Sequence, residues 1–370
     1  MKIEKGSRWV GFATMERFMS DVLKGVGVPP GDAAICADVL ITADKLGIDS
    51  HGISRLKTIY YDRIKQGIQL PKTRFEILRQ TPTTAVIDGH NGMGHVIAKR
   101  AMQIAIRKAK KYGLGMTAVR NSTHYGIAGY YALMASEAGM IGITGTNARP
   151  SVAPTFGTEN MLGTNALTFG MPTDEKFPFL LDCATSVTQR GKIEVYAKLG
   201  RKMPKGWVIN HKGEARTDSR AVLNELVAGA AALVPLGGIG EELSGYKGYG
   251  YSTVVEILSA ALQQGAYMKM LLGMKNGKKV PYHLGHFFLA INIEAFTALR
   301  SFKKITGNIL RELRASKKMP GAARIYTAGE KEHLALLYRK NKGVPLNRET
   351  QREILAMQTE LGLKNYKFRF

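Results

Sequence analysis

The stretch Gly47-Ile-Asp-Ser-His-Gly-Ile-Ser-Arg55 separates two helical patterns and carries four side chains suited to chemistry. Upstream, the apolar spacing predicts a helix over residues 32–46, and Gly47 ends it because glycine readily adopts the positive φ of a helix C-cap. Downstream, apolar residues predict a second helix over residues 54–66. An acid, a hydroxyl, an imidazole and a guanidinium therefore meet between two helices, at Asp49, Ser50, His51 and Arg55.

These four side chains allow two interpretations. An imidazole such as His51 exchanges a proton near neutral pH, and a guanidinium such as Arg55 holds a carboxylate through two parallel hydrogen bonds. Alternatively, Asp49 or Ser50 only caps the second helix and His51 is incidental. The local sequence leaves both interpretations open.

Length and composition predict a globular protein of two domains, because 370 residues with 45% hydrophobic side chains exceed one simple core. The sequence has no apolar run of about 18 residues and no signal-peptide pattern in residues 1–5. We therefore expect a soluble cytoplasmic protein with no membrane partner. Cys36 and Cys183 fall in a predicted helix and a predicted strand, and we expect both to be reduced core residues.

The net charge of +24 is the unusual bulk property of the chain. Such a protein binds polyanions weakly and non-specifically, and it attracts acidic substrates. The sequence contains no zinc-finger spacing, no RNP-like aromatic strand and no Arg/Gly repeat. We therefore expect no specific nucleic-acid partner and interpret the basic residues as solvated faces of an enzyme.

A strand, a glycine-rich turn and a helix around Gly92-Met-Gly94 resemble the start of a βαβ unit. A dinucleotide fingerprint would have its third glycine where Ile97 stands, and an acid after the second strand, where Arg120 and Asn121 stand. The glycines therefore predict a turn and a helix start, not a Rossmann phosphate loop.

Polar side chains gather at the ends of predicted strands, where α/β enzymes place their site residues. Asn121-Ser-Thr-His124 follows one strand, and Asp182-Cys-Ala-Thr-Ser-Val-Thr188 follows a strand predicted over residues 177–181. His124 is either a site residue or a hydrogen-bonded structural histidine. The second cluster could bind a ribose or a phosphate, or orient a histidine.

Two glycine-rich loops, residues 235–240 and 245–250, precede a helix predicted over residues 252–264 with the capping box Thr253-x-x-Glu256. A lysine among these glycines suits an anion such as a pyrophosphate, although no Walker sequence is present. His283-x-x-His286 lacks the partners and the helical spacing of a metal site, so we expect no bound metal.

In their order along the chain, five motifs resemble those of the malate/L-lactate dehydrogenase family that lacks the Rossmann fold. This family includes malate, sulfolactate and ureidoglycolate dehydrogenases, and also diketogulonate and Δ1-piperideine-2-carboxylate reductases. The resemblance extends from the first helix to Gly329-Glu-Lys331, nearly the whole chain. The motifs are Asp49-Ser-His-Gly, Asn121-Ser-Thr-His-Tyr-Gly, Asp182-Cys-Ala-Thr-Ser, Tyr246-Lys-Gly-Tyr-Gly and His286-Phe-Phe.

The resemblance implies an α+β fold. A mixed, largely antiparallel sheet of non-Rossmann type would bind NAD(P), and a helical domain would be built from both chain ends, usually in a homodimer. Residues 1–77 would form the N-terminal part of the helical domain and residues 78–295 the NAD(P)-binding domain. Residues 296–370 would form a C-terminal helical part that packs on the N-terminal helices.

The resemblance also implies reversible hydride transfer between NAD or NADP and C2 of a small 2-hydroxy or 2-keto acid, of malate or lactate type. His51, His124 and Asp182 would form the catalytic group, with His51 as the base and His124 as the next candidate. Ser50, Arg55 and His124 would bind the substrate, with Arg55 on its carboxylate. The cofactor would be held by Asp182, Cys183, Ala184, Thr185, Ser186, Tyr246, Lys247, Gly329, Glu330 and Lys331.

The sequence leaves two other functions open. A member of the same family could reduce a cyclic imine, and a basic nucleic-acid-binding protein could have kept a dehydrogenase fold without turnover. Salt separates the last case from an enzyme, because polyanion binding collapses at high salt whereas cofactor-dependent turnover persists.

Overall fold

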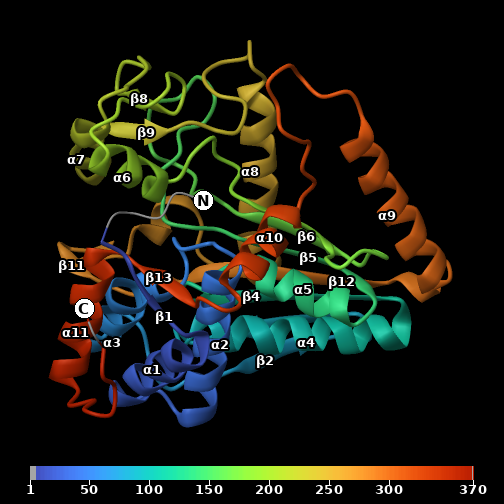
Figure 1. Ribbon diagram of the computed structural model, residues 1–370, viewed down its shortest axis with the longest axis horizontal. Helices are drawn as coiled ribbons and strands as arrows, with labels where there is room; N and C mark the ends of the chain where they lie inside the picture. The colour runs from blue at the N-terminus through green and yellow to red at the C-terminus, as the bar shows by residue number, and fades with distance from the viewer. Residues whose placement is uncertain (1–5, 369) are drawn as a thin grey trace.

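The computed structural model describes residues 6–368 and residue 370, so residues 1–5, where a signal peptide was not expected, lie outside the described residues. In the described chain, the centre of the fold is a seven-stranded mixed sheet with the order β2-β3-β4-β12-β5-β6-β7 (Figure 1). Only the β3–β4 pair is parallel among these neighbours. The expected mixed, largely antiparallel sheet is therefore confirmed. Its strands are β2 (Glu76–Gln80), β3 (Thr84–Asp88), β4 (Leu114–Ser122), β12 (Leu284–Asn292), β5 (Met140–Thr146), β6 (Leu167–Met171) and β7 (Phe179–Cys183).

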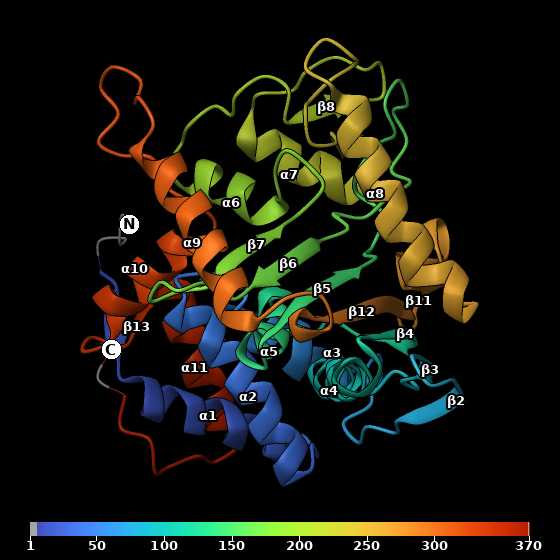
Figure 2. The same cartoon turned by 90° about the vertical axis from the view of Figure 1, so that its right-hand side faces the viewer.

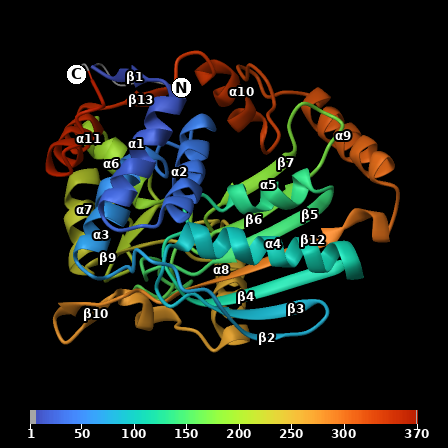
Figure 3. The same ribbon diagram turned by 90° about the horizontal axis from the view of Figure 1, so that it is seen from below.

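Helices cover both faces of this sheet. The helices α4 (Gly94–Tyr112) and α5 (Gly129–Glu137) lie on one face, and α8 (Gly245–Ala260) lies on the other (Figures 1 and 3). The buried side of α4 is built from small and apolar residues, including Ile97, Ala101 and Ala105. Because these side chains are short, α4 packs closely on β4 and β12 and buries the centre of the sheet.

A helical unit beside the sheet combines residues from both chain ends. Its helices are α1 (Phe12–Gly25), α2 (Pro30–Lys45) and α11 (Arg348–Glu360), and the short strand β1 (Arg8–Val10) pairs with β13 (Val344–Leu346). The Phe18 ring packs edge-on against Tyr366 at 5.2 Å and against Phe368 at 5.1 Å. Apolar side chains from the two ends therefore share one core. The domain boundaries near residues 77 and 295 stay predictions.

A smaller lobe packs around its own apolar cluster, and Figure 2 shows it above the sheet. It comprises α6 (Arg190–Lys198), α7 (Ser219–Ala228) and the pair β8 (Val208–Asn210) and β9 (Ala231–Leu233). The remaining elements are the hairpin β10 (Met274–Lys275) and β11 (Lys278–Lys279), the 3-10 turns Ala261–Gln263, Met268–Leu272 and Ile293–Ala295, and the helices α9 (Leu299–Ala315) and α10 (Glu330–Arg339). Among the described residues, no helix has the length and apolarity to cross a membrane.

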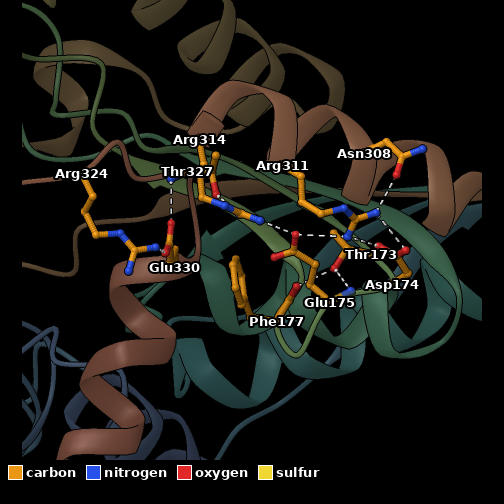
Figure 4. Close-up of polar contacts among 10 residues, drawn as sticks. All are labelled: Thr173, Asp174, Glu175, Phe177, Asn308, Arg311, Arg314, Arg324, Thr327 and Glu330. Carbon is orange, nitrogen blue, oxygen red and sulfur yellow. Dashed lines mark hydrogen bonds and ion pairs between the residues drawn. The ribbon is translucent and has the colours of Figure 1, made fainter. Parts of the chain in front are cut away.

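Residues 296–370 do not all pack on the N-terminal helices. The helix α9 extends along the opposite side of the molecule, where Arg311 binds Asp174 in the β6–β7 turn at 2.9 Å (Figures 1 and 4). Segments from β13 onward do pack on α1 and α2. The expected packing of residues 296–370 is therefore wrong for α9, because its ion pairs hold it to the sheet.

The helix expected over residues 54–66 is not regular. It divides into a 3-10 turn (Ile53–Arg55), a π-helical turn (Leu56–Tyr61) and the short α3 (Asp62–Lys65). Leu56, Tyr60 and Tyr61 are all buried. A turn closed by i→i+5 bonds brings both the fourth and the fifth residue after Leu56 to one side, which a regular α-helix does not do.

The loop expected at residues 245–250 is also different, because α8 begins at Gly245 and includes this segment. Thr253 lies inside the helix and donates to the Tyr249 carbonyl at 2.9 Å, so the expected capping box is wrong. The glycines serve packing instead: a Cβ on Gly248 would lie 2.1 Å from the Leu236 carbonyl oxygen. The helix end thus lies directly against the preceding loop.

The turn at Gly92-Met-Gly94 has no room for a pyrophosphate. The Gly94 N–H donates to Thr123 Oγ1 at 2.9 Å, and the Thr123 hydroxyl donates to the Gly92 carbonyl at 2.7 Å. The N-terminus of α4 is therefore occupied by the strand-end motif that carries His124. This agrees with the prediction that the glycines do not form a Rossmann phosphate loop.

Candidate active site

A cavity of about 340 Å³ lies where the helical unit meets the sheet. Its wall contains segments from the loop after α2, the end of β4, the end of β5 and the strand β7. Six of the predicted site residues line it, namely Ser50, His51, His124, Asp182, Cys183 and Ala184. Other polar side chains in the wall were not predicted, among them Asn147, Gln189 and Glu332.

The two histidines face one another as stacked rings, with centroids 5.7 Å apart and planes inclined by 22°. Nδ1 of His51 lies 2.8 Å from Ser50 Oγ, and Nδ1 of His124 lies 2.5 Å from the Tyr60 hydroxyl. Burial, followed by the positive charge of Arg55, lowers the pKa of His51 to about 4. Burial also lowers the pKa of His124 well below its ordinary value. Both imidazoles are therefore neutral at pH 7, and a neutral imidazole is suited to accept a proton.

The loop that carries His51 is held from α2. The buried Asp44 carboxyl group accepts the Ile53 N–H at 2.9 Å, and burial raises the pKa of Asp44 to about 8. Gly52 is required here, because a Cβ at this position would lie 1.9 Å from Asp44 Oδ1. The glycine of the Asp-Ser-His-Gly motif thus allows the loop to close over a buried carboxyl group.

The same loop is held from α10. Arg339 is fully buried and donates to both carboxylate oxygens of Asp49, at 2.5 and 2.9 Å, and to the Asp44 carbonyl at 2.6 Å. Sequence reasoning missed Arg339, because a single arginine in a charged helical pattern carries no local signal. This side chain connects the C-terminal part of the chain to the residue next to Ser50 and His51.

Arg55 lies beside the cavity and not in its wall. Its Nε donates to the Ser50 carbonyl at 2.5 Å, which fixes one edge of the guanidinium. Its charge acts on both His51 and His124. The other edge carries further N–H donors, in the planar arrangement that binds a carboxylate through two hydrogen bonds.

If Arg55 binds the substrate carboxylate, Arg55→Lys should raise the substrate KM about tenfold or more, because lysine cannot form the bidentate contact. The cofactor KM should change little. Steady-state kinetics with each substrate varied in turn would measure both constants. Unchanged kinetics in the lysine variant would contradict the role of Arg55.

Asp182 lies in the cavity wall but is committed to the fold. Its Oδ2 accepts the Gly129 N–H at the start of α5 at 2.7 Å, and its Oδ1 accepts the Thr168 hydroxyl at 2.9 Å. Burial raises the pKa of Asp182. Within the described chain, no hydrogen bond joins Asp182 to His51 or His124. The carboxylate therefore orders the wall between α5 and β7 next to the histidines.

The predicted cofactor residues after Asp182 divide into two groups. Cys183 and Ala184 line the cavity, and Cys183 is exposed, so the expectation that it is a core residue is wrong; Cys36 is buried as expected. Thr185 and Ser186 are buried and donate to the main chain, at 3.0 Å to the Asn165 carbonyl and 2.8 Å to the Thr188 carbonyl. Their hydroxyls stabilise the loop.

Tyr246 and Lys247 are not brought into the histidine cavity. They lie in the first turn of α8 as exposed side chains, with the Lys247 ammonium 5.7 Å from the Tyr246 ring centre. The preceding loop connects them to the site, because the Leu236 N–H donates to the Thr185 carbonyl at 2.8 Å. A cofactor would have to extend beyond the cavity to reach them.

Gly329-Glu-Lys331 opens α10 next to a second cavity of about 420 Å³, which Gly329 lines. Leu180 and Glu332 belong to the walls of both cavities. Glu330 is buried, forms an ion pair with Arg324 and accepts the Thr327 N–H at 3.2 Å (Figure 4). The ammonium of Lys331 lies over the Tyr326 ring at 5.0 Å. Gly329 of the triplet therefore borders a cavity that shares two wall residues with the histidine cavity.

The two histidines of His283-x-x-His286 have structural partners. His283 Nδ1 lies 3.2 Å from Asn121 Oδ1, and His286 Nδ1 lies 2.8 Å from Thr146 Oγ1. Within the described residues, no group of three His, Cys, Asp or Glu side chains is placed to hold a metal ion.

The low pKa of His51 predicts a simple pH profile if His51 is the base for substrate oxidation. A base with a pKa of about 4 stays unprotonated as the pH falls from 8 to about 5, so kcat/KM for oxidation should stay level over that range. It should fall only as the pH approaches the pKa. Initial rates across this range would test the profile, and a decline that begins near pH 6.5 would indicate an unshifted histidine.

Comparison with known proteins identifies the family. The model of the malate/L-lactate dehydrogenase family matches residues 10–355. The malate dehydrogenase of Pyrococcus abyssi is 46% identical over 347 residues, which cover 94% of this chain and 93% of that protein. The L-sulfolactate dehydrogenase of Methanocaldococcus jannaschii is 37% identical over 350 residues, with 94% and 96% covered.

Solved structures agree with this assignment. The malate dehydrogenase of Entamoeba histolytica superposes with a TM-score of 0.94 and 45% sequence identity, covering 98% of this chain and 100% of that chain. The malate dehydrogenase of Pyrococcus horikoshii OT3 gives a TM-score of 0.87 and 42% identity, with 98% of each chain covered. The chain therefore belongs to the malate/L-lactate dehydrogenase family.

Proposed function

We propose that this chain is a malate dehydrogenase that uses NAD or NADP, transferring hydride between the nicotinamide and C2 of the acid. The observation that carries the proposal is the pair of neutral histidines facing one cavity beside Arg55. Relatives named malate dehydrogenase that match over nearly their whole length support the choice of malate.

The charge around the site also favours a dianionic acid over lactate. The positive charges of Arg55 and Arg149 both act on Arg63, and Arg63 and Arg55 both act on His124. Arg55, Arg63 and Arg149 therefore form a cluster of like charges, two of which act on His124, although none of the three lines the cavity. A substrate with two carboxylates offsets this repulsion better than one with a single carboxylate.

The residues present fit a nicotinamide cofactor. The cavity offers apolar side chains that suit a flat ring, including Ile48, Ile127 and Leu284, and a polar group at Gln189 that suits a carboxamide. The second cavity continues toward Gly329, and Lys331 and Lys247 would supply positive charge for the phosphates. When bound, the cofactor accepts the hydride in oxidation and supplies it in reduction.

The side chains of this chain would position the acid and move its proton. Arg55 would hold the C1 carboxylate, and the C2 oxygen would lie within hydrogen-bond reach of both histidines. In oxidation, the neutral His51 would take the hydroxyl proton as the C2–H bond breaks. The apolar wall would exclude water from this step.

We also propose a homodimer that works in the cytoplasm. The outer face of α9 exposes Ile305, Ile309 and Leu313, with more than half of each side chain accessible. An exposed apolar stripe of this kind marks an association surface. Light scattering should give twice the chain mass for the wild type, and Ile309→Glu should shift it toward the monomer. A monomeric wild type would contradict the dimer.

The decisive experiment follows reduced-nicotinamide absorbance with purified protein. NADH or NADPH would be mixed with oxaloacetate, pyruvate and other 2-keto acids, one at a time. Oxidation of the cofactor with oxaloacetate would support the proposal and identify the cofactor. Turnover of a cyclic imine, with none of any keto acid by folded protein, would reject it in favour of an imine reductase.

A further inference from the structure

Tyr60 is a buried residue whose hydroxyl meets a site histidine. The π-helical turn Leu56–Tyr61 carries its ring completely out of solvent, and the hydroxyl lies 2.5 Å from His124 Nδ1. The tyrosine ring also packs on His95, with centroids 4.6 Å apart. π-helical turns are rare and occur frequently at functional sites. The turn, the burial and the short contact together indicate that Tyr60 acts on His124.

The direction of this hydrogen bond follows from the buried groups around it. The Gly126 N–H points at His124 Nδ1 from 3.3 Å, and an N–H group can only donate. A buried tyrosine hydroxyl needs an acceptor for its hydrogen. His95 is not that acceptor, because neither of its ring nitrogens forms a hydrogen bond within the described chain. Tyr60 therefore donates to His124 Nδ1.

Burial supports the same assignment. It raises the pKa of Tyr60, so the hydroxyl keeps its hydrogen, and it lowers the pKa of His124, so the ring carries a single hydrogen. Because Nδ1 accepts hydrogen bonds, that single hydrogen must be on Nε2, the opposite nitrogen of the ring. His124 lines the cavity, so this nitrogen is the one available to a substrate.

We infer that Tyr60 is a positioning residue that holds His124 in the Nε2–H form, so that His124 donates a hydrogen bond to the C2 oxygen of the substrate and leaves proton transfer to His51. This inference rests on the proposed function. Ser50 Oγ can accept the Nδ1 hydrogen of His51, which leaves the His51 Nε2 lone pair free.

The resulting step is balanced. In oxidation, the substrate O–H bond breaks and its proton passes to His51 Nε2, while the C2–H bond breaks and its electron pair leaves as hydride to the nicotinamide. A carbonyl forms at C2, and the negative charge that develops on its oxygen is stabilised by the His124 N–H. His124 is unchanged at the end of the step, and His51 is protonated.

Nitrogen-15 NMR of histidine-labelled protein tests the tautomer directly, without substrate or cofactor. Long-range proton–nitrogen spectra distinguish a protonated from an unprotonated ring nitrogen, and the signal that His124→Gln removes identifies His124. We expect Nε2 protonated and Nδ1 unprotonated in the wild type. A wild-type His124 with its hydrogen on Nδ1 would overturn the inference, whatever the enzyme turns over.

Tyr60→Phe keeps the ring and removes only the hydroxyl. We expect this variant to shift the His124 nitrogen signals and to lower kcat about 10- to 100-fold with little change in substrate KM, by analogy with the cost of removing a residue that orients a metal-binding histidine. Tyr61→Phe is the matched control, because Tyr61 is the next buried tyrosine of the same turn and packs near Lys57 and Lys65.

We expect Tyr61→Phe to leave the His124 signals and kcat unchanged. Equal effects of the two variants, or His124 signals in Tyr60→Phe identical to those of the wild type, would show that the hydroxyl has only a packing role. If Tyr60→Phe does not fold, the wild-type spectrum alone decides between the two tautomers. Failure of the proposed function would instead appear as absent turnover with the expected tautomer.

Discussion

Replacing His51 by alanine is expected to lower kcat by about 10²–10⁴ while the chain remains folded. His51 lies in the cavity wall with a pKa of about 4, so it is neutral when a 2-hydroxy acid binds. Without it, the hydroxyl proton would have to pass to water, which is a far weaker base. The substrate KM should change less than kcat, because in the proposed mechanism Arg55 would still hold the carboxylate.

We expect His51→Ala to lower kcat without lowering stability, because the fold depends little on the His51 ring. The side-chain hydrogen bond of His51 is local, to the side chain of Ser50, whereas the loop itself is held by Asp44 and Arg339. Alanine should therefore remove the chemistry without releasing the loop. Circular dichroism and thermal unfolding close to those of the wild type would verify this.

His211→Ala provides a control for the loss of a histidine, because His211 is exposed and follows β8 in the small lobe. Its kcat should equal that of the wild type. Stopped-flow or steady-state absorbance at saturating substrate would compare the variants. A small effect of His51→Ala together with a large effect of His124→Ala would exchange the roles of the two histidines.

The parts of the site that the sequence predicted are the ones encoded locally. Asp49-Ser-His51 lies in the loop after α2, and His124 follows the end of β4. Each motif thus lies at the end of a helix or strand, and residues of both motifs line the cavity. The strand predicted over residues 177–181 is likewise present, as β7. These features depend on neighbours only a few residues away, which a sequence displays directly.

The contacts that shape the site join distant segments and leave no such signal. Tyr60 meets His124 across 64 residues, and Arg339 meets Asp49 across 290. Both side chains occur in ordinary helical patterns, where an apolar ring or an arginine is expected for other reasons. Only the fold shows that each ends at a site residue.

The start of α8 shows the opposite failure, in which a strong local signal misled. Glycines at Gly245, Gly248 and Gly250 favour a loop by intrinsic propensity. In the fold, the close approach of Leu236 to Gly248 makes the absence of a side chain useful within a helix. At residues 245–250, tertiary packing therefore outweighed the intrinsic propensity for a loop. Tyr246 and Lys247 lie in the resulting helical turn and do not line the histidine cavity.

Replacing Arg339 by methionine is expected to destabilise the chain by about 1–3 kcal/mol, the usual cost of losing hydrogen bonds from a charged group. The guanidinium is fully buried, whereas the side chain of Asp49 is 51% exposed, so the carboxylate left behind is hydrated and the larger cost of an unpaired buried charge does not arise. Methionine has a similar length but no donors, and the Asp44 carbonyl would lose its bond from Nη1.

Activity should fall in the same variant, since Arg339 fixes Asp49 next to Ser50 and His51. Urea unfolding would measure the stability change. The kcat measured at urea concentrations well below the unfolding transition would show whether the loop that carries His51 is still in place. Arg339→Lys should recover little, because a lysine cannot bind both carboxylate oxygens in the same planar geometry. The stability and the activity should therefore be lost together in both variants.

Lys340→Met separates this effect from a general loss of charge on α10. Lys340 is the next residue and is exposed, so its replacement should change the free energy of unfolding by less than about 0.5 kcal/mol. If Arg339→Met were equally harmless, the pair with Asp49 would contribute nothing net. If it lost stability but kept kcat, the loop that carries His51 would be held by Asp44 alone. Loss of both, with an unaffected Lys340→Met, would show that the helix following the proposed cofactor triplet also fixes the proposed base.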